Sequence, residues 1–221
     1  MNIDILYKIV KILANSKIKL NSLTWTPQNL LSAYGLNNNS LPTNLGESIT
    51  VAVIIAYHYP NLQTDFDAFN VKYGLPYLKL TIKSFTTVQI RDWSEECCLD
   101  IQAIHATAPY ANIMVVEAKD AYNSSLITAI QYAVNNGANI VSMSWGGYEN
   151  TSMLNFENYF KTVNNVCFVA SSGDKSNLVN YPASCANVLA IGGTTLTQNS
   201  NFTRKSEIPW DNNLGAAGNG Y

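Results

Sequence analysis

Continuous apolar runs alternate with amphipathic segments along most of the chain. The apolar runs cover residues 49–57, 112–118, 138–147, 166–174 and 187–193, and Gly46 marks a turn before the first of them. Runs of this length without polar alternation are typical of strands buried on both faces of a parallel sheet. We therefore expect the runs to form the strands of one sheet.

The segments between the runs have helical periodicity. We expect helices over residues 64–76, 93–109, 123–137 and 152–163. Gly74 and Pro76 should end the first helix, and an Asn or Ser cap should begin the third. Strands alternating with helices predict an α/β fold, a doubly wound and mainly parallel sheet with helices on both faces.

The helix predicted over 93–109 carries two acids one turn apart, Glu96 and Asp100. Such a pair repels by a few tenths of a kcal/mol and usually belongs to a solvated face. Here a helical wheel places both acids inside the apolar arc, whereas Ser94, Glu95, Gln102 and His105 lie opposite, on the expected solvent face. Because burying a charge is costly unless it is paired or shares a proton, the pair indicates a functional site.

Two predicted strands end in small polar residues, Ser144-Trp145-Gly146-Gly147 and Ser171-Ser172-Gly173-Asp174. Working residues of doubly wound sheets collect at the carboxyl ends of the strands, so we expect Asp174 to face the crevice there. Taken singly, each segment is also compatible with an ordinary polar turn. A nucleotide-binding module is a further alternative on fold class, although the sequence contains neither G-x-G-x-x-G nor a Walker A motif.

Composition narrows the functional classes. The 221 residues are 47% hydrophobic and 13% charged, with a formal net charge of −2. This near-neutral balance gives no electrostatic footprint for nucleic acid. No apolar run approaches the roughly 18 residues of a transmembrane segment. Residues 1–24 predict an amphipathic helix or the remnant of a leader, without a recognisable signal peptide, and leave the compartment open. Residues 25–221 form the predicted domain.

The four cysteines do not have metal-site spacing, and no metal site is expected from them. They are Cys97, Cys98, Cys167 and Cys185. Adjacent cysteines on a helix cannot easily bond each other, so we interpret the set as buried free thiols. A Cys167–Cys185 disulfide remains an alternative.

Five blocks of sequence, in order over residues 25–196, resemble the sedolisins, the serine-carboxyl peptidases with a subtilisin-like fold. The blocks are WTPQNLLSAYGL, ECCLDIQAIHATAPYANIMVVEA, GANIVSMSWGG, FVASSGD and YPASCANVLAIGGTTL. The resemblance implies an acid-acting serine endopeptidase. It also implies that family members are usually secreted or lysosomal.

By this resemblance Glu96 is the general base, Asp100 its partner and Asp174 the donor of the oxyanion hole. Asp174 can donate a hydrogen bond only while protonated, and Glu96 must be ionised to accept a proton, so both roles favour acidic pH. Ser144, Trp145 and Gly146 would bind an extended polypeptide substrate as an added strand.

The sequence also departs from the family pattern. The family's nucleophile lies in a downstream Gly-Thr-Ser motif that does not occur here, and the family's calcium site near the C-terminus is absent, so no cofactor is expected. We expect the N-terminal two-thirds of a catalytic domain, truncated at the C-terminus and inactive alone unless a separate C-terminal piece completes it. The alternative is a catalytically dead, peptide-binding pseudoenzyme. His58 and His105 are expected to be ordinary surface residues.

Overall fold

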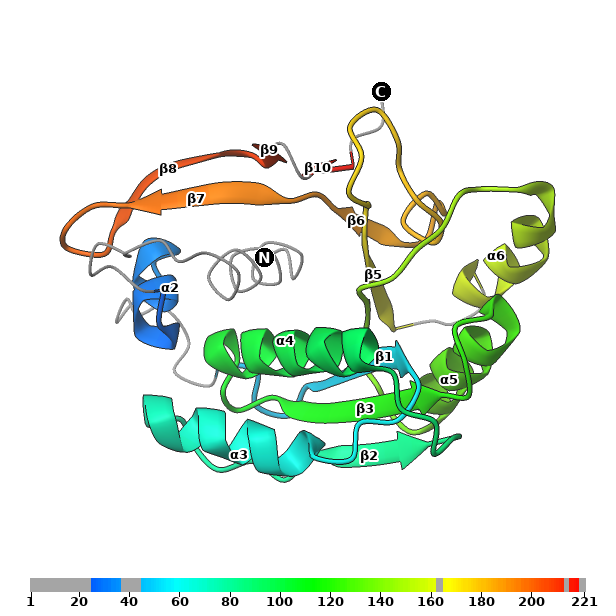
Figure 1. Cartoon of the computed structure of the whole chain (residues 1–221), viewed down its shortest axis with the longest axis horizontal. Coiled ribbons are helices and arrows are strands. Elements are labelled where there is room, and N and C mark those ends of the chain that lie inside the picture. The colour runs from blue at the N-terminus through cyan, green and yellow to red at the C-terminus, as the bar shows by residue number, and fades with distance from the viewer. Residues whose placement is uncertain (1–24, 37–44, 162–164, 213–214, 219–221) are drawn as a thin grey trace.

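A six-stranded, all-parallel sheet in the order β2-β3-β1-β4-β5-β6 forms the centre of the computed structural model (Figure 1). The structure describes residues 25–36, 45–161, 165–212 and 215–218, so the helix predicted over 1–24 lies outside the described residues. The strands are β1 Thr50–Ala56, β2 Thr81–Ser84, β3 Asn112–Ala118, β4 Ile140–Met143, β5 Cys167–Ser171 and β6 Leu189–Ile191. The predicted α/β fold is confirmed, with β2 as an additional edge strand.

Strand β1 lies inside the sheet, between β3 and β4, and both of its faces are apolar. Its neighbours are β3, with Thr50 opposite Asn112, and β4, with Val51 opposite Ile140. A hydrophobic core lies on each face of the sheet, and alternate residues of β1 point into one or the other. Val53 packs into one core and Ile54 into the other, and both are fully buried. A run without polar positions is therefore required at this place in the sheet.

Helices cover both faces of the sheet, as predicted (Figure 1). Helices α3 (Leu62–Tyr73) and α4 (Arg91–Thr107) pack on one face. Helices α5 (Asn123–Asn135) and α6 (Leu154–Lys161), the latter preceded by the 3-10 turn η1 (Thr151–Met153), pack on the other. Gly74 ends α3 as predicted. The predicted Asn or Ser cap of α5 is wrong, because Tyr122 occupies that position without a side-chain bond to the helix.

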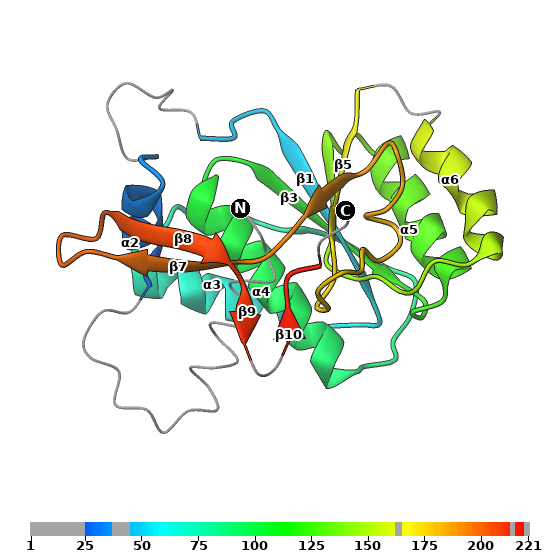
Figure 2. The same ribbon diagram turned by 90° about the horizontal axis from the view of Figure 1, so that it is seen from above.

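The chain beyond the parallel sheet forms elements that the sequence pattern did not predict. Helix α2 (Pro27–Ala33) precedes the sheet, and an antiparallel hairpin, β7 (Thr194–Gln198) and β8 (Arg204–Pro209), follows it. The hairpin crosses over one end of α2 (Figures 1 and 2). Leu196 packs on the helix, and the hydroxyl of Tyr34 donates to Glu207 Oε1 over 2.8 Å. After the hairpin, the short strands β9 (Asp211–Asn212) and β10 (Gly215–Ala216) pair with each other in antiparallel orientation.

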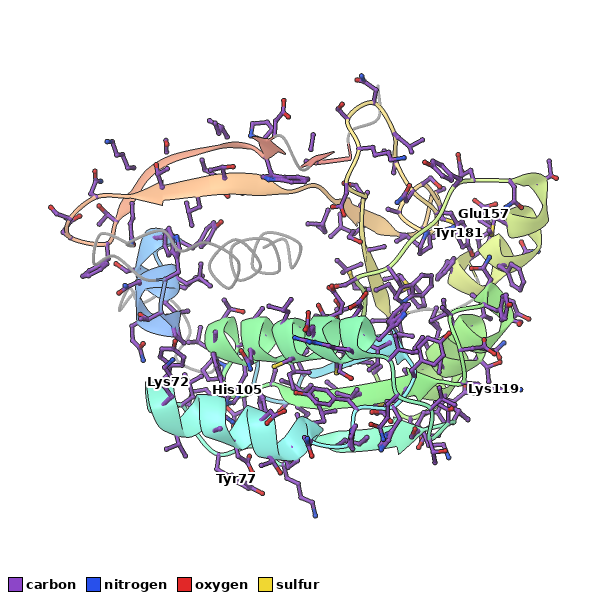
Figure 3. The ribbon with its side chains drawn as sticks, in the orientation of Figure 1. Lys72, Tyr77, His105, Lys119, Glu157 and Tyr181 are labelled. Carbon is purple, nitrogen blue, oxygen red and sulfur yellow. The ribbon has the colours of Figure 1, made fainter. Side chains whose placement is uncertain are left out.

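His105 is fully buried between α4 and α3, so its prediction as a surface residue is wrong (Figure 3). Its ring packs on Phe66, with 5.0 Å between the ring centroids. Nε2 lies 2.9 Å from the carbonyl oxygen of Pro76 and must donate, because a carbonyl only accepts. The helical wheel located one buried face of α4 correctly. His105 is buried as well, because Phe66 of α3 packs against its ring, whereas Ser94, Glu95 and Gln102 on the same side of α4 are only partly buried.

His105 should make stability depend on pH. Burial lowers the pKa of His105, so the unfolded chain binds the proton more readily than the folded chain. The free energy of unfolding should therefore fall as pH drops below the unfolded pKa of about 6.5. Urea unfolding of the wild type and of His105→Gln, which retains a donor for Pro76, should show a shallower decrease in the variant between about pH 8 and 5. Equal decreases would contradict this assignment.

All four cysteines are free thiols, so the Cys167–Cys185 alternative is not realised. Cys97 and Cys185 are buried as predicted, but Cys167 is exposed and Cys98 is only partly buried. Burial, assisted by the nearby carboxylates of Asp100 and Glu117, raises the pKa of Cys97. This thiol is therefore a packing residue and not a nucleophile.

Within the described residues, no helix has the length and apolar character needed to cross a bilayer.

Candidate active site

Helix α4 carries Glu96 and Asp100 at its sheet-facing side, beside the buried residues Cys97 and Ile101. The pattern of one apolar stripe fixes this rotation of the helix, because Cys97 and Ile101 enter the core formed with β1 and β3. Asp100 is fully buried and Glu96 is partly buried. The two acids thus lie at different depths of one face.

Ser144 connects the end of β4 to the buried acid. Strand β4 ends at Met143, earlier than predicted, and the chain leaves the sheet at Ser144. The Ser144 hydroxyl donates to Asp100 Oδ1 over 2.8 Å, and Trp145 Nε1 donates to the carbonyl oxygen of Ile54 over 3.0 Å. Both contacts hold this segment over the carboxyl ends of β1 and β4.

Glycine at position 146 permits a close approach of two chain segments. A Cβ there would lie 2.8 Å from the carbonyl oxygen of Tyr181 and 3.0 Å from Cβ of Asn180. The next residue, Gly147, exchanges two backbone hydrogen bonds with Tyr181, of 3.0 and 2.9 Å. The C-terminal end of the segment Ser144–Gly147 is therefore hydrogen-bonded to Tyr181, in the loop that follows β5.

That loop presents Asp174, whose side chain is exposed to solvent. Gly173 before it has φ +107°, and a Cβ would lie 2.8 Å from Nδ2 of Asn180, so the position requires glycine on both counts. The backbone around Asp174 is held by hydrogen bonds from the amide of Ala216 to Asp174 O and from that of Gly218 to Gly173 O. Chain segments more than 40 residues apart thus position this acid.

One pocket of about 310 Å³ brings the predicted residues together. Glu96, Ser144–Gly146 and Asp174 line it, whereas Asp100 lies behind Ser144 and does not. The remaining lining residues, which sequence reasoning did not select as site residues, are Gly147, Tyr148, Ser171, Gly173, Lys175, Leu178 and Asn180. The arrangement offers an acid able to accept a proton, a second acid able to donate a hydrogen bond, and a flanking strand-like segment.

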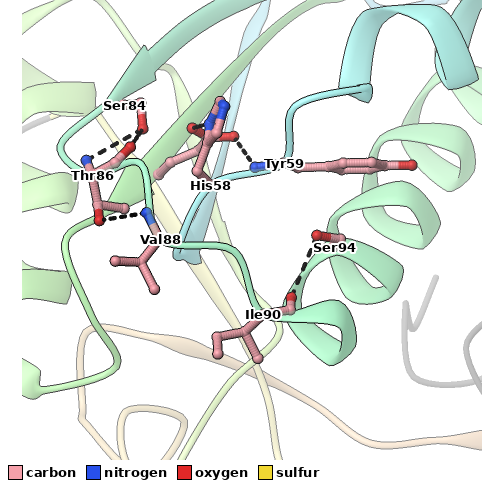
Figure 4. Close-up of polar contacts among 8 residues, drawn as sticks. His58, Tyr59, Ser84, Thr86, Val88, Ile90 and Ser94 are labelled. Carbon is pink, nitrogen blue, oxygen red and sulfur yellow. Dashed lines mark hydrogen bonds and ion pairs between the residues drawn. The ribbon is translucent and has the colours of Figure 1, made fainter.

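His58 is half-buried and paired, so its prediction as an ordinary surface residue is also wrong. Its Nδ1 lies 2.7 Å from Oε2 of Glu117, a fully buried residue of β3, and the amide of Tyr59 donates to the other carboxyl oxygen over 2.9 Å (Figure 4). The sequence did contain a signal, since Glu117 interrupts an otherwise apolar strand. A buried carboxylate requires a partner, and the residues after β1 supply it.

Across the described ranges, no group of three or more His, Cys, Asp or Glu side chains is arranged to hold a metal ion.

Comparisons with known proteins relate the chain to a family and to a fold. A model of the subtilase family matches residues 33–218. Thermitase from Thermoactinomyces vulgaris is 32% identical over 111 residues, which are 48% of this chain and 40% of thermitase. The structure of Pseudomonas sedolisin, a serine-carboxyl proteinase complexed with two molecules of pseudo-iodotyrostatin, matches with a TM-score of 0.72 and 24% identity, over 88% of this chain and 61% of that chain.

The fold resemblance inferred from the five sequence blocks is therefore confirmed. The chain spans less than two-thirds of the length of each of these two relatives.

Proposed function

The chain belongs to the subtilase family. From the sedolisin-like sequence blocks and the residues of the pocket, we propose that it forms the acid-acting, serine-carboxyl part of an endopeptidase site. The pocket that unites Glu96, Asp174 and the segment Ser144–Gly146, with Asp100 behind it, supports the proposal most strongly. Because the family's Gly-Thr-Ser motif does not occur among the 221 residues, the proposal requires a nucleophilic serine from another polypeptide segment.

In the proposed reaction, Glu96 accepts the proton of the serine hydroxyl while the serine oxygen bonds to the carbonyl carbon of the scissile peptide. The carbonyl oxygen becomes an oxyanion, which accepts a hydrogen bond from protonated Asp174. Glu96 then gives its proton to the leaving amine as the C–N bond breaks, and water releases the acyl group by the same steps. Asp100, held by Ser144, positions Glu96 through a shared proton.

The substrate in this proposal is an unfolded polypeptide. The segment Ser144–Gly146 lines the pocket beside Glu96 and Asp174, and its backbone can pair with an extended chain in the manner of an added strand. Pairing of this kind recognises backbone rather than side chains, which suits an endopeptidase.

A peptide-binding pseudoenzyme is the second candidate. The specific observation in its favour is that the peptide-binding segment is held intact by Trp145 and Gly147 while the 221 residues contain no Gly-Thr-Ser motif. This candidate shares the cleft but not the chemistry, so catalysis distinguishes the two.

We expect the purified chain to bind a denatured protein saturably at about pH 4 without cleaving it. Fusion to a C-terminal segment that carries the family's Gly-Thr-Ser motif should produce cleavage, and replacement of that serine by alanine should remove it again. Fluorescence anisotropy measures binding, and mass spectrometry of the products measures cleavage.

The outcomes separate the alternatives. Binding together with a folded but inactive fusion would favour the pseudoenzyme. Cleavage by the chain alone, lost in Glu96→Ala, would contradict a nucleophile from outside these residues. A folded chain that binds no polypeptide would refute both candidates.

A further inference from the structure

The rim of the pocket carries a lysine held against an aromatic ring. The ammonium of Lys175 donates to the hydroxyl of Tyr148 over 2.5 Å and lies 5.2 Å from the centroid of the same ring. Both residues line the pocket. Tyr148 lies two residues after Gly146, the last residue of the segment proposed to bind peptide, and Lys175 directly follows Asp174, the proposed oxyanion donor. Two loops thus present one positive charge.

The proposed mechanism does not use this charge. The charged lining residues are Glu96, Asp174 and Lys175, and the two acids have assigned roles. The hydrogen-bond partner of Lys175 is a neutral phenol, which does not neutralise the ammonium. The hydrogen bond from Lys175 to Tyr148 raises the pKa of Lys175, so the ammonium persists across the working pH range.

Tyr148 is exposed, with 61% of its surface accessible. Its ring and hydroxyl restrict the flexible lysine side chain, which reduces the entropy that a ligand would otherwise have to remove on binding. The exposed ring surface can also contact the methylene groups of a ligand side chain. Together the two residues present a positioned cation with an apolar support.

We propose that Lys175 and Tyr148 form a subsite for a carboxylate of the bound polypeptide, so that this cleft selects acidic substrates. The inference depends on the proposed function, because it requires an extended peptide along Ser144–Gly146. Tyr148 and Lys175 line the same pocket as Ser144–Gly146, so a side chain at one end of such a peptide would come within reach of them. The carboxylate would then pair with the ammonium of Lys175 beside the phenol.

Binding of matched peptides to the whole 221-residue chain tests the subsite. The probes are short extended peptides with blocked termini that differ only in one central Glu, Gln or Lys. At about pH 5.5 the free Glu side chain is ionised. We expect the Glu peptide to bind about two- to fivefold more tightly than the Gln peptide, the range for a solvent-accessible ion pair, and to lose this advantage at high salt.

Charge reversal gives the decisive comparison. Lys175→Glu should remove the preference for Glu and favour the Lys peptide, while the Gln peptide binds as before. Lys72→Glu is the matched control, because Lys72 also lies over a tyrosine ring, at 5.2 Å, but belongs to α3 (Figure 3). This control should retain the wild-type preference. Circular dichroism of each variant establishes that it is folded.

A further pair of Gln peptides, one with a free C-terminal acid and one with an amide, distinguishes a terminal carboxylate from a side-chain carboxylate. A Lys175-dependent preference for either carboxylate supports the subsite and identifies its source. Equal binding of the Glu, Gln and acid-ended peptides, or a preference unchanged in Lys175→Glu, would overturn it. Failure of the folded chain to bind any peptide would instead refute the proposed function.

Discussion

Glu96→Gln should lower the rate of peptide hydrolysis by about 10²- to 10⁴-fold in the form that carries the nucleophilic serine. Glutamine has nearly the same shape as glutamate but cannot accept the serine proton. The hydrogen bond from Ser144 to Asp100 does not involve Glu96 and should persist. Initial rates on a denatured protein at about pH 4 give kcat/KM, and anisotropy gives peptide affinity, which should change little.

The neighbouring acid provides a matched control for this prediction. Glu95 lies on the same helix but forms an exposed ion pair with Arg91, 2.7 Å long, one turn before it. Glu95→Gln removes the same charge from α4 and should leave the rate within about twofold, since exposed ion pairs contribute little. If both variants lost activity equally, the loss would reflect the net charge of the helix and Glu96 would not be the base.

His58→Ala should lower the free energy of unfolding by about 3 kcal/mol. The substitution leaves the Glu117 carboxylate fully buried with the Tyr59 amide but without the imidazole that lies 2.7 Å from it. An uncompensated buried charge is costly because the interior solvates it poorly. Urea unfolding at neutral pH measures the change, with an unchanged m-value indicating an unchanged denatured state.

Replacing both partners separates charge burial from loss of packing. The double variant His58→Leu, Glu117→Leu removes the buried charge together with its partner and should recover most of the stability lost in His58→Ala. Lys161→Ala, which breaks the exposed ion pair with Glu157 on α6, should cost less than about 1 kcal/mol. A double variant as unstable as His58→Ala would contradict charge burial as the cause of the lost stability.

Among the residues that the structure describes, the buried acids Asp100 and Glu117 lie on the α4 side of the sheet, close to Cys97. Their partners come from different segments, Ser144 after β4 and His58 after β1. In both cases a residue that follows a parallel strand supplies the hydrogen-bond partner of the buried acid. This is possible because the carboxyl ends of the strands meet at one edge of the sheet. The sequence indicated the first of these acids through helical spacing but did not identify the second.

The predictable part of the site is the part encoded by local periodicity. The strand predicted over 112–118 matches β3, and the apolar stripe of α4 oriented Glu96 and Asp100 toward the sheet. Strand order then carries Asp174 and Ser144 to the same pocket, because all parallel strands end at one edge. These inferences need only the periods of helix and strand and the topology of a parallel sheet.

The parts that were wrong depend on contacts between distant segments. His105 looked solvent-facing because a helical wheel describes one helix, whereas α3 packs over that face through Phe66. The hairpin β7–β8 and helix α2 are stabilised by each other, through contacts such as that of Tyr34 with Glu207 across 173 positions. No local pattern contains such a partner.

By itself, therefore, the sequence determined strands β1, β3, β4, β5 and β6, helices α3 to α6, and the acids that gather at the carboxyl edge of the sheet. Only the tertiary structure decided the burial of His105 against α3, the pairing of His58 with Glu117, and the placement of Asp100 behind Ser144. The physical reason is that periodicity records the average environment of a residue along its own element. A specific partner exists only once separate elements have packed together.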